Sequence, residues 1–174
     1  MNAIYNRRSI RSYTGEPIGN ETIRQIIRAG MAAPSTKNCQ EWIFVVMKER
    51  AQFVRFTEVS EYAQALGTAA AAILVCADLS RDEILEEGWW IQDCSAAMEN
   101  MLLEATEQGI GSLWLGVYPR QERMDFMKEL CNLPDHVQPL GLMALGMAKR
   151  EKDPIDRYLE EQVFDGEYGT PFSP

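Results

Sequence analysis

Residues 92–119 read QDCSAAMENMLLEATEQGIGSLWLGVYP, and they contain a helical pattern, a break and a strand pattern in succession. Apolar and small residues cover more than one side of the helical pattern over 89–108, as is typical of a helix buried on several faces. The GIG sequence at 109–111 breaks this helix, and a strand is expected over Ser112–Tyr118 until Pro119 closes it. The stretch therefore predicts a long buried helix that leads directly into a sheet.

Helical and strand patterns alternate along the rest of the chain. Ile23, Ile26, Ile27 and Met31 fall on one face of a helix that we expect Asn20 to cap. Further helices are expected near residues 2–8 (capped by Asn2), 50–56, 62–71 and 120–131, and further strands over Trp42–Lys48, Ile73–Ala77 and Gln138–Met147. The alternation predicts an α/β arrangement of three layers, with helices on both faces of a sheet.

The chain has 174 residues, for which one domain over 1–174 is expected, with residues 159–174 as a polar C-terminal tail. The N-terminus shows no secretory pattern. The longest apolar run, residues 69–77, is much shorter than the roughly 20 residues that a membrane helix needs. We therefore expect a cytoplasmic protein that does not associate with membranes.

The net charge of −9 argues against nucleic-acid binding. Positive charge is nevertheless concentrated near the N-terminus, where residues 1–30 contain five arginines and two glutamates: Arg7, Arg8, Arg11, Arg24, Arg28, Glu16 and Glu21. A local basic cluster in an acidic protein favours a small anion as ligand.

The sequence gives little support for a metal site or for a nucleophilic side chain in catalysis. The cysteines at 39, 76, 94 and 131 form no CxxC pair, and the single histidine, His136, follows Pro134 in a loop-like segment. We therefore expect free thiols, no metal site and no catalytic side chain of the Ser-His or Cys-His type.

Two segments in the first quarter of the chain suit a planar phosphorylated ligand. Residues 7–11 read RRSIR, and arginine binds phosphate through two charge-assisted hydrogen bonds. Residues 34–42 read PSTKNCQEW and place neutral donors and acceptors at close spacing, which suits the carbonyls and ring nitrogens of a heterocycle. The alternatives are a solvated basic face and a turn before a core tryptophan.

Two later segments complete the set. Residues 109–116, GIGSLWLG, form no phosphate loop because their helix precedes the glycines, but Gly116 would let backbone approach a ligand beside Trp114 and Leu115. Residues 146–158 place four basic residues among acids after an apolar strand. A tight helix-to-strand turn and a solvated tail are the competing interpretations.

Taken in order, the segments RRSIR at 7–11, APSTKNCQEW at 33–42, residues 92–119 and KDPIDRY at 152–158 resemble the short, single-domain branch of the nitroreductase family. The resemblance covers about residues 2–158. It implies an α+β fold of three α/β/α layers around a mainly antiparallel sheet. It also implies a homodimer with two flavin mononucleotide (FMN) sites at the subunit interface, and the apolar surplus of the helix around 95–105 agrees with a dimer.

The resemblance also assigns cofactor-binding residues. Contacts to the phosphate, ribityl chain and pyrimidine edge of FMN are implied for Arg7, Arg8, Ser9 and Arg11, with Arg11 expected near N1 and O2. Contacts to the same flavin from the other subunit are implied for Pro34, Ser35, Thr36, Asn38 and Gln40. Contacts along the isoalloxazine are implied for Leu113, Trp114, Leu115 and Gly116. A C-terminal phosphate contact is implied for Arg157, with Lys149 and Arg150 as further candidates.

The implied activity is FMN-dependent hydride transfer from NADH or NADPH to a small electrophilic acceptor of the nitroaromatic, quinone or enone type, in a ping-pong scheme. The flavin would carry the chemistry, so no catalytic side chain is required. An FMN-binding protein without turnover and an α/β module for another phosphorylated molecule are the alternatives. Glu41 replaces the proline usual in the family, which is expected to put a carboxylate near the pocket mouth, and the tail is shorter than in larger relatives.

Overall fold

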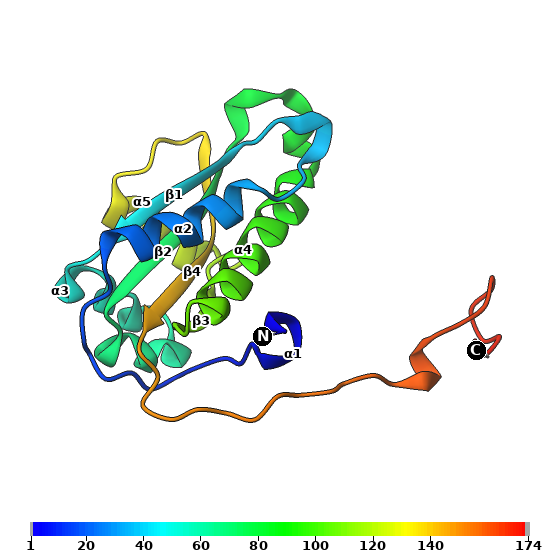
Figure 1. The fold of residues 1–174 in the computed structure, drawn as a ribbon. Helices are drawn as coiled ribbons and strands as arrows, with labels where there is room; N and C mark the ends of the chain where they lie inside the picture. The colour runs from blue at the N-terminus through cyan, green and yellow to red at the C-terminus, as the bar shows by residue number, and fades with distance from the viewer. Residues whose placement is uncertain (1, 173–174) are drawn as a thin grey trace.

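The computed structural model describes residues 2–172, in which helices and strands alternate (Figure 1). The α-helices are α1 (Ala3–Asn6), α2 (Asn20–Met31), α3 (Arg50–Phe53), α4 (Trp89–Glu107) and α5 (Gln121–Cys131). The strands are β1 (Trp42–Met47), β2 (Ala71–Asp78), β3 (Gly111–Gly116) and β4 (Val137–Gly146). Short 3₁₀ helices span Thr36–Asn38, Val54–Glu58, Glu61–Thr68, Leu79–Arg81, Glu83–Glu87 and Glu160–Gln162.

The strands form one sheet in the order β1-β2-β4-β3, and every neighbouring pair is antiparallel. One row of side chains crosses all four strands, because Val45 lies opposite Leu74, Leu74 opposite Leu142, and Leu142 opposite Leu115. The central strands β2 and β4 are buried along nearly their whole length. Their apolar runs are continuous because both faces of the sheet are covered.

Helices cover the sheet on both faces. One core cluster joins the sheet to α2 and α4, and the other joins it to α3, α5 and the 3₁₀ helices between β1 and β2. The expected three-layer α+β arrangement with an antiparallel central sheet is confirmed.

The long helix α4 is buried mainly against its own chain. Its most buried residues are Trp90, Asp93, Cys94, Ala97, Met98, Met101, Leu102 and Ala105. Helix α2 approaches it closely, since a Cβ atom on Gly30 would lie 2.8 Å from Cγ of Met101. The apolar surplus predicted around 95–105 is thus largely covered within one subunit, and it gives less support to a dimer than expected.

Several local predictions need correction. Asn2 does cap α1, through its side-chain oxygen and the Ile4 amide, but Gly19 and not Asn20 precedes α2. The Asn20 side chain instead accepts a hydrogen bond from Lys48 Nζ at 2.6 Å. Met31, which was expected on the apolar face of α2, is 52% exposed. The helix expected over 62–71 is a 3₁₀ helix that ends at Thr68, before β2 begins.

The two ends of the chain run side by side before the C-terminal segment leaves the body (Figure 1). Backbone hydrogen bonds join Thr14 to Met147, Lys149 to Ser12 and Ile155 to Tyr5 at 2.9–3.2 Å. Beyond Ile155 the chain extends away from the sheet as an arm. Among residues 2–172, no helix combines the length and the apolar character needed to cross a membrane.

Candidate functional site

The N-terminal arginine segment is attached to the edge of the sheet. Ser9 forms a parallel bridge with Ser112 at the start of β3, and the Ile10 amide donates to the Ser112 carbonyl at 2.9 Å. The Ile10 side chain is buried, and the Ile10 carbonyl accepts from the Tyr13 hydroxyl at 2.8 Å. Successive side chains of an extended segment point to opposite sides. Anchoring Ile10 therefore turns its neighbours Ser9 and Arg11 outward.

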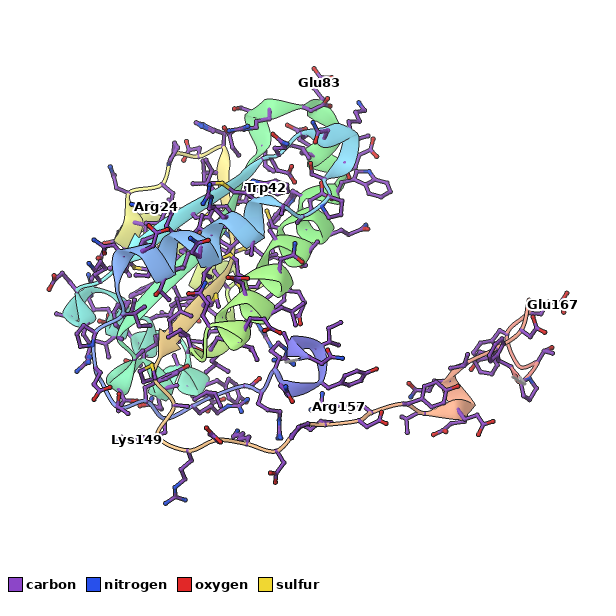
Figure 2. All side chains as sticks on the ribbon, in the orientation of Figure 1. Arg24, Trp42, Glu83, Lys149, Arg157 and Glu167 are labelled. Carbon is purple, nitrogen blue, oxygen red and sulfur yellow. The ribbon has the colours of Figure 1, made fainter. Side chains whose placement is uncertain are left out.

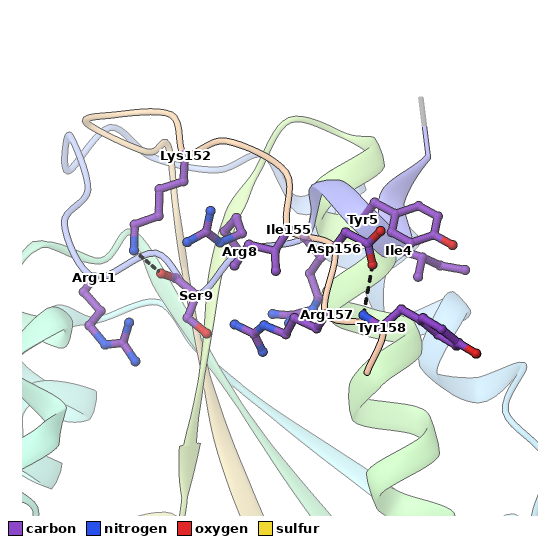
Figure 3. A pocket seen from close by; sticks show the side chains of 11 residues that line it. Ile4, Tyr5, Arg8, Ser9, Arg11, Lys152, Ile155, Asp156, Arg157 and Tyr158 are labelled. Atoms are coloured by element: carbon purple, nitrogen blue, oxygen red, sulfur yellow. Dashed lines mark hydrogen bonds between the residues drawn. The ribbon is translucent and has the colours of Figure 1, made fainter. Parts of the chain in front are cut away.

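A cavity of about 540 Å³ opens beside this segment (Figure 3). Its polar and charged lining comes from both ends of the chain: Arg7, Arg8, Ser9, Arg11, Lys152, Asp156 and Arg157. The structure therefore brings Arg157 into the same cavity as the N-terminal cluster. We call this cavity the arginine cavity.

Some of these cations have internal partners. Arg7 Nε lies 3.3 Å from a carboxylate oxygen of Glu99 on α4. Arg8 donates to the Asp153 carbonyl, and Lys152 Nζ donates to the Ser9 carbonyl at 2.8 Å, so the two ends of the chain hold each other (Figure 3).

The charge of the arginine cavity is strongly positive. Among the described residues, no carboxylate lies within ion-pair distance of Arg11 or Arg157. Five cationic side chains face one lining carboxylate, Asp156, within a chain of net charge −9. Such an arrangement fits a dianionic ligand group such as a phosphate monoester.

A second cavity of about 420 Å³ adjoins β3, and Arg11 lines both. The other lining residues are Ser60, Tyr62, Leu113, Trp114, Leu115, Gly116 and Arg123. We call it the β3 cavity. Leu113 and Leu115 are only 4% and 5% exposed, so β3 contributes mostly its backbone, the half-buried Trp114 and the exposed Gly116.

The segment over 34–40 lies near the N-terminal end of α4, whereas the start of the chain, which contributes to the arginine cavity, lies near the C-terminal end of this helix. The Thr36 amide and hydroxyl donate to the Asp93 carboxylate at 2.8 and 3.3 Å, near the first turn of the helix. The Ala3 amide donates to the Glu107 side chain at the last turn. At 1.5 Å per residue, Asp93 and Glu107 are separated by about 20 Å along the axis. None of residues 34–40 lines the arginine cavity or the β3 cavity, and Figure 2 shows Trp42, which follows this segment, far from Arg157.

The 34–40 segment forms a tight turn with hydrogen bonds inside it. Its Gln40 amide donates to Ser35 Oγ at 3.0 Å, and the Gln40 side chain donates to the Asn38 side chain at 3.2 Å. Lys37, Asn38 and Gln40 have positive φ angles of 50–57°. Pro34, Asn38 and Gln40 are exposed, and Ser35 and Thr36 are half-buried.

Glu41 does not stand at a pocket mouth, so this expectation was wrong. Its side chain is fully buried, and both carboxyl oxygens lack a hydrogen-bond donor in the part of the chain that the structure describes. Burial, aided by the adjacent Asp93 carboxylate, raises the pKa of Glu41 to about 7.

The structure adds lining residues that the sequence reasoning did not select. Lys152 stands in the arginine cavity, and its place in the KDPIDRY segment could have suggested it. Tyr62 and Arg123 line the β3 cavity, where Arg123 donates to the Gly116 carbonyl at 2.9 Å. No sequence signal marks these two. Lys149 and Arg150 line a further cavity of about 360 Å³ together with Arg11.

Comparisons with known proteins agree with this arrangement. A family model described as the nitroreductase family matches residues 4–64 and 48–147. A protein of Archaeoglobus fulgidus named as an NADH dehydrogenase/NAD(P)H nitroreductase is 45% identical over 88% of this chain and 87% of its own length. The solved structure of an NADH oxidase from Clostridium acetobutylicum superposes with a TM-score of 0.90 at 38% identity, covering 95% of this chain and 99% of the other. A nitroreductase from Desulfovibrio desulfuricans, solved in complex with FMN, has a TM-score of 0.77 at 28% identity and 95% coverage of each chain. All three names are provisional.

Proposed function

We propose a function that starts from the family of the protein: this chain belongs to the nitroreductase family. The protein is an FMN-dependent oxidoreductase that uses NADH or NADPH. The acceptor is a small electrophile of the nitroaromatic, quinone or enone type. When bound, FMN supplies the hydride-transfer chemistry, in one half-reaction with the nicotinamide and one with the acceptor.

The observation that carries this proposal is the meeting of Arg157 with Arg7, Arg8 and Arg11 in one cavity. Arg157 is far from the other three arginines in sequence, and their convergence concentrates positive charge where a phosphate would bind. Guanidinium groups bind phosphate oxygens in pairs of charge-assisted hydrogen bonds. We therefore assign Arg8 and Arg157 to the FMN phosphate. Arg7, which is also paired with Glu99, supports the same site.

Arg11 has a second role in this proposal because it lines both cavities. A phosphate in the arginine cavity would put the ribityl chain beside Ser9 and the flavin ring against β3. The Arg11 guanidinium would then reach the pyrimidine edge near N1 and O2, where it would favour additional electron density on the ring. Trp114 and Gly116 would lie along the ring, with Leu113 and Leu115 beneath them.

The complete site requires a second copy of the chain. Asn38 and Gln40 have exposed side chains, Ser35 and Thr36 are half-buried beside them, and none of the four lines its own arginine cavity, so we assign them, with Pro34, to the flavin bound by a partner subunit. Exposed apolar side chains near the departing arm support a homodimer. They are Ile4 (68% exposed), Tyr5 (54%), Tyr158 (65%) and Leu159 (45%). Ile4, Tyr5 and Tyr158 also line the arginine cavity, and in this proposal a second chain covers the apolar surface around it.

Cofactor binding and turnover are tested on the purified chain. FMN is added to protein stripped of small molecules, and its binding is followed by flavin absorbance and fluorescence. NADH or NADPH is then added in the absence of oxygen, and the visible absorbance of the flavin is followed. We expect stoichiometric binding and loss of absorbance with at least one donor.

The outcomes separate the possible functions. Binding without loss of absorbance with either donor would identify a flavin-binding protein without turnover. Absence of FMN binding would overturn the cofactor assignment and favour another phosphorylated ligand in the arginine cavity.

The dimer is tested by light scattering of the FMN-bound protein at micromolar concentration. We expect twice the subunit mass of 19.8 kDa. A monomer that still holds FMN would contradict the assignment of the 34–40 segment to a partner's flavin.

A further inference from the structure

The buried carboxyl of Glu41 has no role in the site as described so far. It is fully buried between the 34–40 segment and β1, and no donor of the described residues reaches either oxygen. A buried carboxylate without hydrogen bonds or a counter-charge is strongly unfavourable, so such a group is usually protonated or paired.

The group beside it is a second acid. Asp93, near the start of α4, is 7% exposed, and its carboxylate is one of the groups that raise the pKa of Glu41. Asp93 in turn accepts the Thr36 amide at 2.8 Å and the Thr36 hydroxyl at 3.3 Å. A line of contacts therefore runs from Glu41 through Asp93 to the 34–40 segment.

That segment needs an external anchor. Lys37, Asn38 and Gln40 all have left-handed backbone conformations. Asparagine tolerates this conformation, but for Lys37 and Gln40 it is unfavourable and persists only where the surroundings hold it. Within the segment, the Ser35 and Thr36 carbonyls accept from the Asn38 and Cys39 amides at 2.9 Å. The two bonds to Asp93 are the ones that attach this turn to a long helix.

The other titratable and charged groups around Glu41 leave the pair without full compensation. Cys94 on α4 and Cys39 in the preceding turn are thiols whose pKa values are raised by burial. Arg81 is the nearby cation, but its guanidinium lies 3.7 Å from Asp78, a carboxylate that also has His136 at 3.9 Å.

We propose that Glu41 is a positioning residue for the flavin site: its protonated carboxyl donates to the Asp93 carboxylate, and the acid pair holds Thr36 and the turn over 37–40 in the shape that contacts FMN. This inference rests on the proposed function, because it takes the 34–40 segment as the part that reaches the flavin of the partner subunit. Glu41 acts through Asp93 and Thr36 and does not itself touch the cofactor.

The protonation state of the pair makes this role dependent on pH. Because burial and Asp93 raise the pKa of Glu41 to about 7, the Glu41 proton is present in weakly acidic solution and lost in weakly basic solution. Two adjacent buried carboxylates repel each other, and the repulsion would loosen the hold of Asp93 on Thr36.

The test compares FMN affinity at about pH 6 and about pH 8.5, one or more units on either side of the raised pKa. The variants are wild type, Glu41→Gln, whose amide donates permanently, and Glu41→Ala, which removes the contact. Glu129→Gln serves as the matched control, because Glu129 is an exposed carboxylate on α5, across the sheet from α4. Each FMN dissociation constant is divided by that of the control at the same pH, which cancels the titration of FMN itself.

We expect the normalised wild-type dissociation constant to rise by about tenfold across this interval, as a shift of one pKa unit in the bound state would produce. The dissociation constant of Glu41→Gln should not change with pH and should be close to that of the wild type at the lower pH. The Glu41→Ala variant should bind FMN weakly at both pH values. If the normalised dissociation constants of wild type and Glu41→Gln changed equally with pH, the inference would be overturned.

Amide hydrogen exchange gives a second readout that requires no flavin. The Thr36 amide should exchange faster in wild type than in Glu41→Gln at the higher pH, and equally at the lower one. If no variant binds FMN, the proposed function fails, and the exchange result still decides whether the acid pair holds the turn. Equal exchange of the Thr36 amide in both proteins at both values would overturn that contact as well.

Discussion

Ser9 and Ser112 face each other across a parallel bridge, which places the N-terminal arginine segment along the outer edge of β3. The bridge explains how one short segment serves two cavities. Arg7 and Arg8 precede it and lie in the arginine cavity, whereas Arg11 follows it and also reaches the β3 cavity. A ligand with a phosphate at one end and an apolar ring at the other matches this geometry.

Replacing either proposed phosphate arginine should weaken FMN binding. We expect Arg8→Ala and Arg157→Ala each to raise the FMN dissociation constant by about 10- to 100-fold, since a hydrogen bond to a charged group contributes roughly 1.5–3 kcal/mol. Titration calorimetry or quenching of flavin fluorescence would measure the change. Arg24→Ala is the matched control, because Arg24 is an exposed residue on α2 that pairs with Glu21 on the same helix. An equal loss in the control, or none in either variant, would contradict the phosphate assignment.

Arg11→Ala should change the reduction potential of bound FMN as well as its affinity. The loss of a positive charge near the pyrimidine edge is expected to lower the two-electron midpoint potential by about 30 mV or more, which corresponds to roughly 1.4 kcal/mol. Arg11→Lys, which keeps the charge, should recover most of the shift. The measurement is spectroelectrochemical titration of the FMN-bound protein. If Arg11→Ala had the wild-type potential, the residue would not lie beside the ring.

Gly146 leaves room for the side chain of Tyr13, just after the arginine segment. It lies at the end of β4, where an added Cβ atom would come within 2.7–2.9 Å of the ring and Cβ atoms of Tyr13, a fully buried side chain. Gly146→Ala should therefore lower the free energy of unfolding by roughly 1–3 kcal/mol, as is common for overpacked cores. Gly67→Ala is the control, because nothing lies within 4 Å of the added atom. Urea unfolding of both variants measures the difference, and equal midpoints would show that Tyr13 moves without cost.

The sheet was predictable because its apolar runs are long and buried on both sides. The strand patterns of β2 and β4 reflect two covered faces, and the long helix α4 shows its burial in its small and apolar residues. The predictions of local structure were wrong where a contact with a residue distant in sequence outweighed the local pattern. The Asn20 side chain bonds to Lys48 instead of capping α2. The segment over 61–68 packs into the core as a 3₁₀ helix.

The sequence allowed the residues of the candidate site to be predicted, but not their positions relative to one another. The resemblance suggested that Arg157 belongs with the N-terminal cluster, and the structure places them in one cavity. The position of Glu41 was misjudged because a residue between a polar turn and a strand was expected to face solvent. Helices and loops cover both sides of the start of β1, so that Glu41 and Trp42 are both buried even though neighbouring side chains point in different directions.

The buried Glu41 should also make the stability of the protein depend on pH. Its pKa is about 7 in the folded chain and 4.5 in the unfolded one. Between these values the unfolded state loses its proton while the folded state keeps it, so the free energy of unfolding falls as the pH rises. By linkage the fall amounts to on the order of 3 kcal/mol, and no further loss from this group is expected above about pH 7.

Glu41→Gln removes this titration and should be more stable than wild type by about that amount near pH 8. The difference should shrink steadily toward pH 4.5, because both proteins then bury a neutral group. Urea unfolding at one fixed protein concentration measures the curves, since a dimer's stability depends on concentration. Glu129→Gln removes one carboxylate from an exposed position and should run parallel to wild type. Parallel curves for Glu41→Gln as well would mean that the buried carboxyl is already compensated, for instance by Arg81, and that its pKa is not raised.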